Sequence, residues 1–393
     1  MNYRKLFREH KIIRDLSLVQ FIAYFGAWFS NVAIYTMLVD FGSTEMAISV
    51  VTAMHFIPAI LIAPLSGAII DRVKIKPLMI FLLSTELLMT ILFLTIDNKE
   101  QIWFLMILIF IRMSAASMFF STEMSLLAKL LNGKPLQMAN EIHSIIWSFT
   151  YAVGMAVSGF VVNSFGHKTA FIIDAIIFAV ALIVFIRIDF VVKASQTTDK
   201  IFQLIKDGFI YIKNNKLILH LIFLHSSVGL TSFDALITIL AKNEYKYIIS
   251  VPLAIGLSNA VRAVALMFGP MFISKYVTKE NLHYLLAFQG LAIILWSLTQ
   301  SNFYISLISL FIVGLSTTTL WSFTYALLQN NCDEKYIGRV ISYNDMFFML
   351  ACVVTTLFIG LMASLISTDI ITILLGIGFL AFAFYYTRIL KWI

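Results

Sequence analysis

The feature that most constrains this chain is a series of twelve long apolar stretches. A helix needs about 20 apolar residues to cross a lipid bilayer, and each stretch is close to or above that length. Strands of a membrane β-barrel alternate over about ten residues, whereas these runs are continuous. The sequence therefore predicts an all-α membrane protein with twelve spanning helices, near residues 17–41, 46–70, 77–97, 102–128, 138–162, 169–187, 216–241, 250–273, 282–300, 302–328, 341–364 and 369–388.

The distribution of charged residues along the chain indicates a membrane topology and does not indicate a nucleic-acid-binding surface. Only 12% of the 393 residues are charged, against about 25% in soluble domains. If the N-terminus is cytoplasmic, 22 lysines and arginines fall in cytoplasmic segments and four fall on the opposite side. Cytoplasmic loops are enriched in basic residues. We therefore expect a multi-pass protein of the bacterial inner membrane with both termini cytoplasmic and no nucleic-acid partner.

A polar stretch at 188–213 divides the chain into halves. We expect an N-terminal six-helix bundle over 1–190, a cytoplasmic linker over 191–213 and a C-terminal six-helix bundle over 214–393. Within the linker, a disordered segment competes with an amphipathic helix on the membrane surface. The helix is favoured because apolar residues recur on one helical face, at Ile201, Leu204, Ile205, Phe209 and Ile212.

The two halves resemble each other. Asn140-Glu141 opens the fifth helix after a short basic loop, and Asn344-Asp345 opens the eleventh helix after another, 204 residues later. The hydropathy of the halves matches as well. Parallel six-helix repeats around a central pathway are one known plan of secondary transporters.

The loop between the second and third helices reads Gly67-Ala-Ile-Ile-Asp71-Arg72-Val-Lys74-Ile-Lys76. A glycine at position 67 permits close helix packing, and a carboxylate at position 71 is placed to meet a neighbouring helix N-terminus. We interpret Gly67, Asp71 and Arg72 as a conformational gate that joins the ends of the second and eleventh helices. The openings of the fifth and eleventh helices complete this gate: Asn140, Glu141, Asn344 and Asp345.

This loop resembles the signature of the major facilitator superfamily, which runs Gly, three residues, Asp-Arg and further basic residues. Arg112 resembles the buried arginine of that superfamily's fourth helix. The chain looks closest to the branch of macrolide and multidrug efflux proteins and siderophore exporters. That likeness rests on residues 58–67, Ala139-Asn140, residues 171–175 and Gly338-Arg339-Val340. Ala27 departs from the branch, because many relatives have an acidic residue there.

Ionisable groups inside the membrane need a reason, because each costs a few kcal/mol in hydrocarbon. Arg112 and Glu123 are 11 residues apart on the fourth helix, which puts them on one face and roughly 16 Å apart. Arg112 either recognises the substrate or forms a structural ion pair. Asp234 and Arg262 lie in the seventh and eighth helices, and they either serve transport or pair with each other.

Polar side chains also line the first and tenth helices. In the resembled superfamily, the first, fourth, seventh and tenth helices surround the cavity. We therefore assign substrate or proton coupling to Gln20, Tyr24, Asn31, Arg112, Glu123, Asp234, Arg262, Trp321 and Tyr325. His55, His220 and His225 are interpreted as packing groups, and no spacing indicates a metal site or a cofactor.

The resemblance implies a secondary transporter and not an enzyme. We expect an exporter (an efflux antiporter) that moves a drug, macrolide or siderophore by alternating access as a monomer, driven by protons that bind at Glu123 or Asp234. A lipid or lysophospholipid flippase of the same fold is the alternative, because two buried arginines suit an anionic head group. A membrane scaffold or a membrane enzyme is a third interpretation.

Overall fold

The computed structural model describes residues 3–70, 72–131, 133–190 and 201–392. In these ranges the chain is helical and contains no β-strand. The α-helices are α1 (Tyr3–Glu9), α2 (Lys11–Asp40), α3 (Glu45–Ala53), α4 (Ile57–Ile70), α5 (Ile75–Leu92), α6 (Ile102–Leu130), α7 (Gly133–Phe165), α8 (His167–Ile186), α9 (Ile201–Asn214), α10 (Lys216–Ser226), α11 (Asp234–Asn243), α12 (Val251–Ile273), α13 (Leu282–Thr299), α14 (Phe303–Asn330), α15 (Ile337–Met362) and α16 (Thr368–Ile389).

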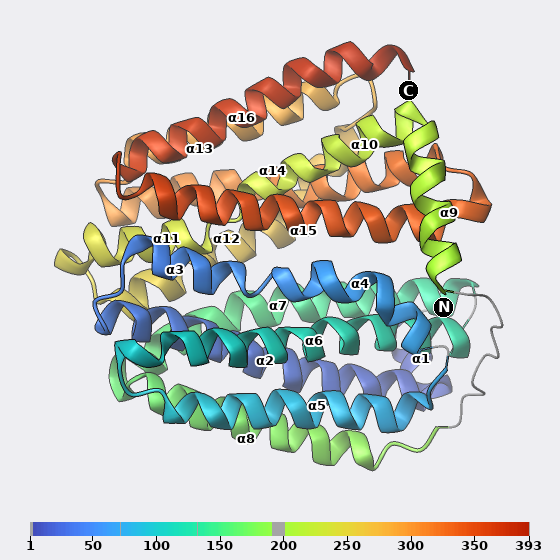
Figure 1. The fold of residues 1–393 in the computed structure, drawn as a ribbon, viewed down its shortest axis with the longest axis horizontal. Helices are drawn as coiled ribbons and strands as arrows, with labels where there is room; N and C mark the ends of the chain where they lie inside the picture. Colours follow the sequence, from blue (N-terminus) through green and yellow to red (C-terminus); the bar gives the residue numbers. More distant parts are fainter. Residues whose placement is uncertain (1–2, 71, 132, 191–200, 393) are drawn as a thin grey trace.

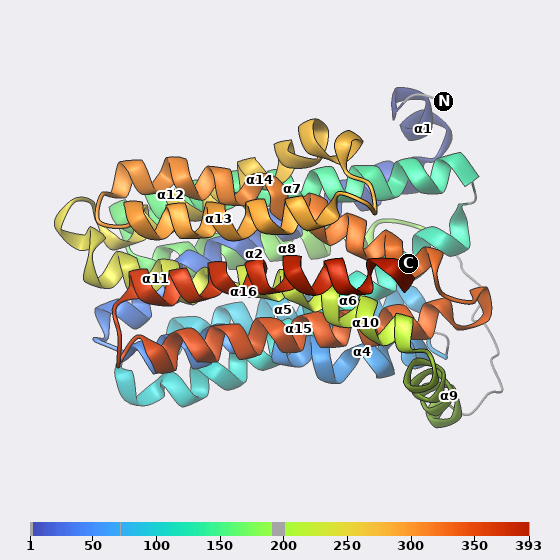
Figure 2. The same ribbon diagram turned by 90° about the horizontal axis from the view of Figure 1, so that it is seen from above.

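Twelve helical segments of the described residues are long and apolar enough to cross a membrane, which confirms the predicted number. Figure 1 shows α2 to α8 packed together in the lower part of the view and α10 to α16 in the upper part. Both termini and α9 lie at one end of the helices, here called the termini end (Figures 1 and 2). The opposite end, where α3 begins, is called the Glu45 end.

Helix α9 lies across the termini end (Figure 1) and contacts the C-terminal half. The hydroxyl of Tyr343 donates to the carbonyl of Ile205 at 3.0 Å, and the amide of Asp333 donates to the hydroxyl of Tyr211 at 3.0 Å. These contacts attach α9 to α15 and to the loop that precedes it. The remainder of the expected linker, residues 191–200, lies outside the described residues.

Two of the spans are broken, whereas the sequence analysis treats them as continuous. In the second span α3 ends at Ala53 and α4 begins at Ile57. Pro58 explains this break, because its ring clashes with the carbonyl four residues earlier and it has no N–H to donate. In the seventh span α10 gives way to a 3-10 helix over Ser227–Thr231 before α11 begins.

The two halves meet closely at the Glu45 end. A Cβ at Gly159 of α7 would lie 2.8 Å from the carbonyl oxygen of Pro252 in α12, so only a glycine allows this approach. Lys242 of α11 donates to the carboxylate of Glu45 and to the carbonyl of Ser43, both at 2.8 Å. The larger of two hydrophobic clusters also draws on both halves. This end is therefore closed by packing and by charge.

Candidate functional site

The guanidinium of Arg112 in α6 is paired inside the N-terminal half. Its Nη2 donates to the carboxylate of Asp174 in α8 at 2.9 Å, and the hydroxyl of Ser30 in α2 donates to the same carboxylate oxygen. The rings of Phe93 and Phe178 lie 5.6 and 5.2 Å from the guanidinium carbon. Asp174 is fully buried. Arg112 therefore has a protein partner for its charge, in the arrangement of a structural ion pair.

Glu86 of α5 adds a second carboxyl to this neighbourhood. It is 5% exposed and interacts electrostatically with Arg112 and Asp174. One guanidinium thus lies among two carboxyl groups from two other helices. The charges join α5, α6 and α8, with α2 contributing Ser30. A buried charge is stable only with such partners.

A second polar group lies where α2, α6 and α7 meet, and we call it the Glu123 socket (Gln20, Tyr24, Glu123 and His143). The side-chain amide of Gln20 is hydrogen-bonded to Nδ1 of His143 and interacts with Glu123. The ring of Tyr24 meets His143 edge-on at 5.8 Å. Glu123 is 2% exposed, and its Oε2 has no hydrogen-bond partner among the described residues.

The two candidates Asp234 and Arg262 do not form an ion pair with each other among the described residues. Nη2 of Arg262 donates to the carbonyl of Thr231 at 2.8 Å, and its guanidinium lies over the ring of Phe233 at 5.3 Å. Thr231 ends the 3-10 segment, so Arg262 satisfies a carbonyl that the break in the seventh span leaves free. Asp234 begins α11, where the helix dipole favours a negative charge.

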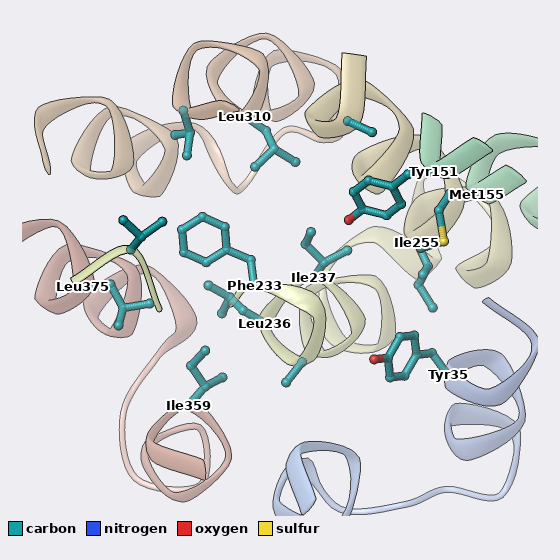
Figure 3. Packing of buried hydrophobic residues seen from close by; sticks show 14 of the residues in the cluster. Tyr35, Tyr151, Met155, Phe233, Leu236, Ile237, Ile255, Leu310, Ile359 and Leu375 are labelled. Atoms are coloured by element: carbon teal, nitrogen blue, oxygen red, sulfur yellow. The ribbon is translucent and has the colours of Figure 1, made fainter. Parts of the chain in front are cut away.

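Two tyrosines of the N-terminal half face this break. Figure 3 shows the hydroxyls of Tyr35 (α2) and Tyr151 (α7) directed toward the helix that carries Ile237, which is α11. Both interact electrostatically with Asp234. The hydroxyl of Tyr151 also donates to Oδ1 of Asn259 in α12 at 3.3 Å. Asp234 therefore lies at the contact between the halves.

A third polar group lies in the C-terminal half, and we call it the His225 socket (His225, Trp321, Thr324, Tyr325 and Phe348). Nδ1 of His225 in α10 is 2.8 Å from the hydroxyl of Thr324 in α14. The rings of Trp321, Tyr325 and Phe348 surround the imidazole at centroid distances of 5.6, 5.5 and 5.6 Å. His225 is fully buried, and its Nε2 has no partner among the described residues.

The other predicted residues are distributed over both halves. Asn31 lies partly buried on α2, and Arg72 is exposed just after α4. Asn140 is exposed and Glu141 partly buried near the start of α7. Of the predicted gate, Asp71 lies outside the described residues, and Gly67 lies within α4, which packs against α15.

Asn344 of α15 is fully buried, and its side-chain amide donates to Oδ1 of Asp345 at 3.5 Å. Asp345 is partly buried and interacts electrostatically with Tyr325. The structure thus places one member of the predicted gate next to the His225 socket. In the described part of the chain, no group of three or more His, Cys, Asp or Glu side chains is arranged to hold a metal ion.

A family model described as "Major Facilitator Superfamily" matches residues 16–356. The chain belongs to the major facilitator superfamily. Members of this superfamily are secondary transporters, and the predicted superfamily is thereby confirmed. The chain is also similar to an uncharacterized transporter of the superfamily, YfiS of Bacillus subtilis (strain 168), with 26% identity over 222 residues, which are 55% of this chain and 52% of that protein. The match thus spans about half the length of this curated relative.

Solved structures agree on the superfamily's fold. The nucleoside transporter NupG is 14% identical, with a TM-score of 0.74 over 96% of this chain and 99% of that one. A bacterial homologue of the human lysosomal transporter Spinster, in an inward-facing and occupied conformation, is 12% identical, with a TM-score of 0.73 over 97% of both chains. At these identities the likeness concerns the fold alone.

Sequence reasoning missed three residues that the structure brings into these groups. Asp174 was available as the only carboxylate of α8, facing an arginine that needed a partner. His143 lies three positions after Asn140 and two after Glu141. Thr324 lies between the predicted residues Trp321 and Tyr325, and nothing in its local sequence distinguishes it from other membrane threonines.

Proposed function

We propose that this major facilitator protein is a proton-coupled exporter of amphipathic small molecules, such as a drug, a macrolide or a siderophore. The observation on which the proposal rests is the Glu123 socket. Among the described residues, no ion pair is formed by Glu123, and a buried carboxyl group of this kind is rare inside a membrane and marks a proton or substrate pathway. Gln20 hydrogen-bonds to Glu123, Tyr24 interacts with it electrostatically, and His143 bonds to Gln20, and an amide side chain can donate to or accept from a carboxyl group in either protonation state.

Exchange follows if proton binding at Glu123 and substrate binding exclude each other. A proton that binds neutralises Glu123 and favours release of the substrate, and a substrate that binds favours release of the proton. An inward proton gradient then drives the substrate outward. The protein would alternate between a state closed at the Glu45 end, by the packing of Gly159 and by Lys242, and a state closed at the termini end.

We further propose that the termini end is cytoplasmic and that the protein is a monomer in the bacterial inner membrane. The gate residues Gly67, Asp71 and Arg72 would act at this end, where α4 packs on α15. The flippase alternative has less support. A flippase would need unpaired arginines to bind the anionic head group of the lipid. Here Arg112 pairs with Asp174, and Arg262 bonds to a main-chain carbonyl.

The test of this function is transport by reconstituted protein. Proteoliposomes with an acidic lumen should accumulate ethidium or erythromycin, and the accumulation should stop when an ionophore dissipates the pH gradient. Glu123→Gln mimics the protonated group, so it should lose gradient-driven uptake at least tenfold. Glu244→Gln, which changes an exposed carboxylate at the Glu45 end, is the matched control.

Proton coupling at Glu123 would be refuted if Glu123→Gln kept the wild-type response to the gradient. Substrate counterflow measured without a pH gradient distinguishes a loss of proton coupling from a loss of substrate binding. The Glu123→Gln protein should still exchange labelled for unlabelled substrate. If counterflow is lost together with gradient-driven uptake, Glu123 binds the substrate directly and does not serve coupling alone.

A further inference from the structure

The His225 socket occupies the same helix positions as the Glu123 socket. Gln20 and His225 each lie nine residues after the first residue of their helices, Lys11 of α2 and Lys216 of α10. Glu123 and Thr324 each lie 21 residues after the first residues of α6 and α14, which are Ile102 and Phe303. The two sockets are therefore equivalent positions of the internal repeat.

At these positions the second half has aromatic side chains where the first half has a charged group. Thr324 stands where the first half has Glu123, and three rings surround the histidine. Trp321 and Tyr325 are stacked on each other at 4.9 Å and 21°, and Trp321 is 38% exposed. A ligand that lies against Trp321 would therefore be next to His225. The socket is built for an apolar body and a single polar contact.

The hydrogen bonds of Thr324 determine which nitrogen of His225 is free to accept. The hydroxyl of Thr324 donates to the carbonyl of Leu320 at 2.7 Å. A hydroxyl has one hydrogen, so while that hydrogen is donated to the carbonyl of Leu320, the Thr324 oxygen accepts from Nδ1–H of His225. Neutral His225 consequently presents a bare lone pair at Nε2. A buried acceptor of this kind without a partner calls for a donor.

The charges around the socket select the kind of donor. Asp345 lies on α15 next to Tyr325 and, among the described residues, forms no ion pair with a lysine or arginine. No cation of the described chain lies over the rings of Trp321, Tyr325 or Phe348. Aromatic faces and a carboxylate attract a positive charge, and none of the described lysines or arginines lies over these rings to hold an anion.

We propose that the His225 socket binds the protonated amine of an aromatic or apolar organic cation, with an N–H of the amine donating to Nε2 of His225. The apolar body lies against Trp321 and Tyr325, and Asp345 provides the long-range attraction. This inference rests on the proposed function and narrows its substrate class. It also separates the halves: the first handles the proton, and the second recognises the substrate.

Three matched probes test this proposal by equilibrium dialysis on the purified full-length protein. They are dimethyl(naphthylmethyl)ammonium, which has one N–H, its trimethyl counterpart, which has the same ring and charge but no N–H, and the anion naphthylacetate. We expect the dimethyl compound to bind about tenfold more tightly than the trimethyl compound, since one buried hydrogen bond to a charged group separates them. Naphthylacetate should bind most weakly.

The His225→Phe protein keeps the ring and loses the acceptor. It should lose the preference for the dimethyl compound, while its affinity for the trimethyl compound stays within about twofold. His225→Gln restores an acceptor and should keep the preference. His220→Phe is the matched control, because His220 lies on the same helix but bonds to Tyr385 outside the socket. Trp321→Ala should weaken both ammonium probes.

Three results would overturn the proposal: equal binding of the two ammonium probes by the wild type, binding of naphthylacetate as tight as theirs, or an equal loss of both ammonium probes in His225→Phe. The wild-type comparisons need no variant, so they hold even if His225→Phe does not fold. Binding in detergent needs no gradient. If the N–H preference is found but proton-driven transport is not, the coupling proposal fails and the socket stands. If proton-driven transport is found but the N–H preference is not, the proposal for the His225 socket fails and the coupling proposal stands.

Discussion

Replacing Arg112 by methionine tests whether this arginine has a structural role. The substitution keeps the length and apolar stem of the side chain and removes the charge. Asp174 would then remain fully buried with Ser30 as its hydrogen-bond donor. Removing one partner of a buried ion pair costs about 3–5 kcal/mol, because the other charge is left uncompensated. Glu86 nearby adds to this cost, since its electrostatic partner is lost as well.

The expected change is large enough to measure as a melting temperature in detergent. If the N-terminal six helices melt as one unit, each kcal/mol corresponds to about 2–4 °C, so Arg112→Met should melt roughly 6–20 °C below the wild type. Asp174→Asn added to Arg112→Met should recover much of this loss, because the buried charge is removed. Asparagine is the suitable replacement, since Oδ1 of Asp174 would lie only 2.6 Å from a Cβ at Gly26, leaving no room for a larger side chain. Arg388→Met, an exposed arginine over Phe384, is the control.

Transport by the same variants decides between the two roles considered from the sequence. If Arg112 is structural, the Arg112→Met/Asp174→Asn double variant should regain transport as it regains stability. If Arg112 contacts the substrate, the single variant should lose transport at nearly unchanged melting temperature, and the double variant should stay inactive. That second pattern would refute the structural interpretation.

Two further predictions concern the ends of the molecule. Lys242→Met removes the contacts to Glu45 and Ser43, and the side chains of Lys242 and Glu45 are both about one-fifth exposed. If the closed state thereby loses about 1 kcal/mol of stability, the labelling of a cysteine placed between α3 and α11 should rise about fivefold. Unchanged labelling would mean that this contact does not hold the end closed. Reporter fusions after the last residue and within 242–248 should place the C-terminus in the cytoplasm and the loop on the opposite side, as the distribution of basic residues predicts, and a periplasmic C-terminal reporter would contradict this topology.

The spans could be predicted from sequence because lipid imposes them. In hydrocarbon every backbone N–H and C=O must bond within its own segment, so a long apolar run has one available structure. Hydropathy therefore located all twelve segments. The break in the second span was also visible in principle, since Pro58 lies inside the apolar run. The break at Ser227–Thr231 has only Gly229 and scattered hydroxyl residues as signals, and such residues are common in continuous membrane helices.

The partners of the buried polar groups could not be predicted in the same way. Which face of a helix meets which neighbour depends on the rotation of both helices about their axes, and a continuous apolar run contains little information about rotation. Arg112 and Asp174 are 62 residues apart on helices that are not consecutive. Asp234 and Arg262 seemed a plausible pair on adjacent helices, yet the break in the seventh span gives Arg262 a carbonyl to bond.

The equivalence of the two sockets explains how one repeat could serve two tasks. Both lie where the first and fourth helices of a half meet, roughly 14 Å from the start of the first helix. The first half has a carboxyl inside its socket, Glu123, so the charge of that socket changes when a proton binds. The described residues of the His225 socket include no carboxyl, and Asp345 lies beside that socket, next to Tyr325. The second half can therefore recognise a ligand through His225 and Thr324 without a proton binding inside its socket. Because equivalent positions of the two halves lie at the same depth, motion of one half against the other would expose both sockets from the same side. Proton and substrate would then be exchanged in one conformational step, although no side chain contacts both.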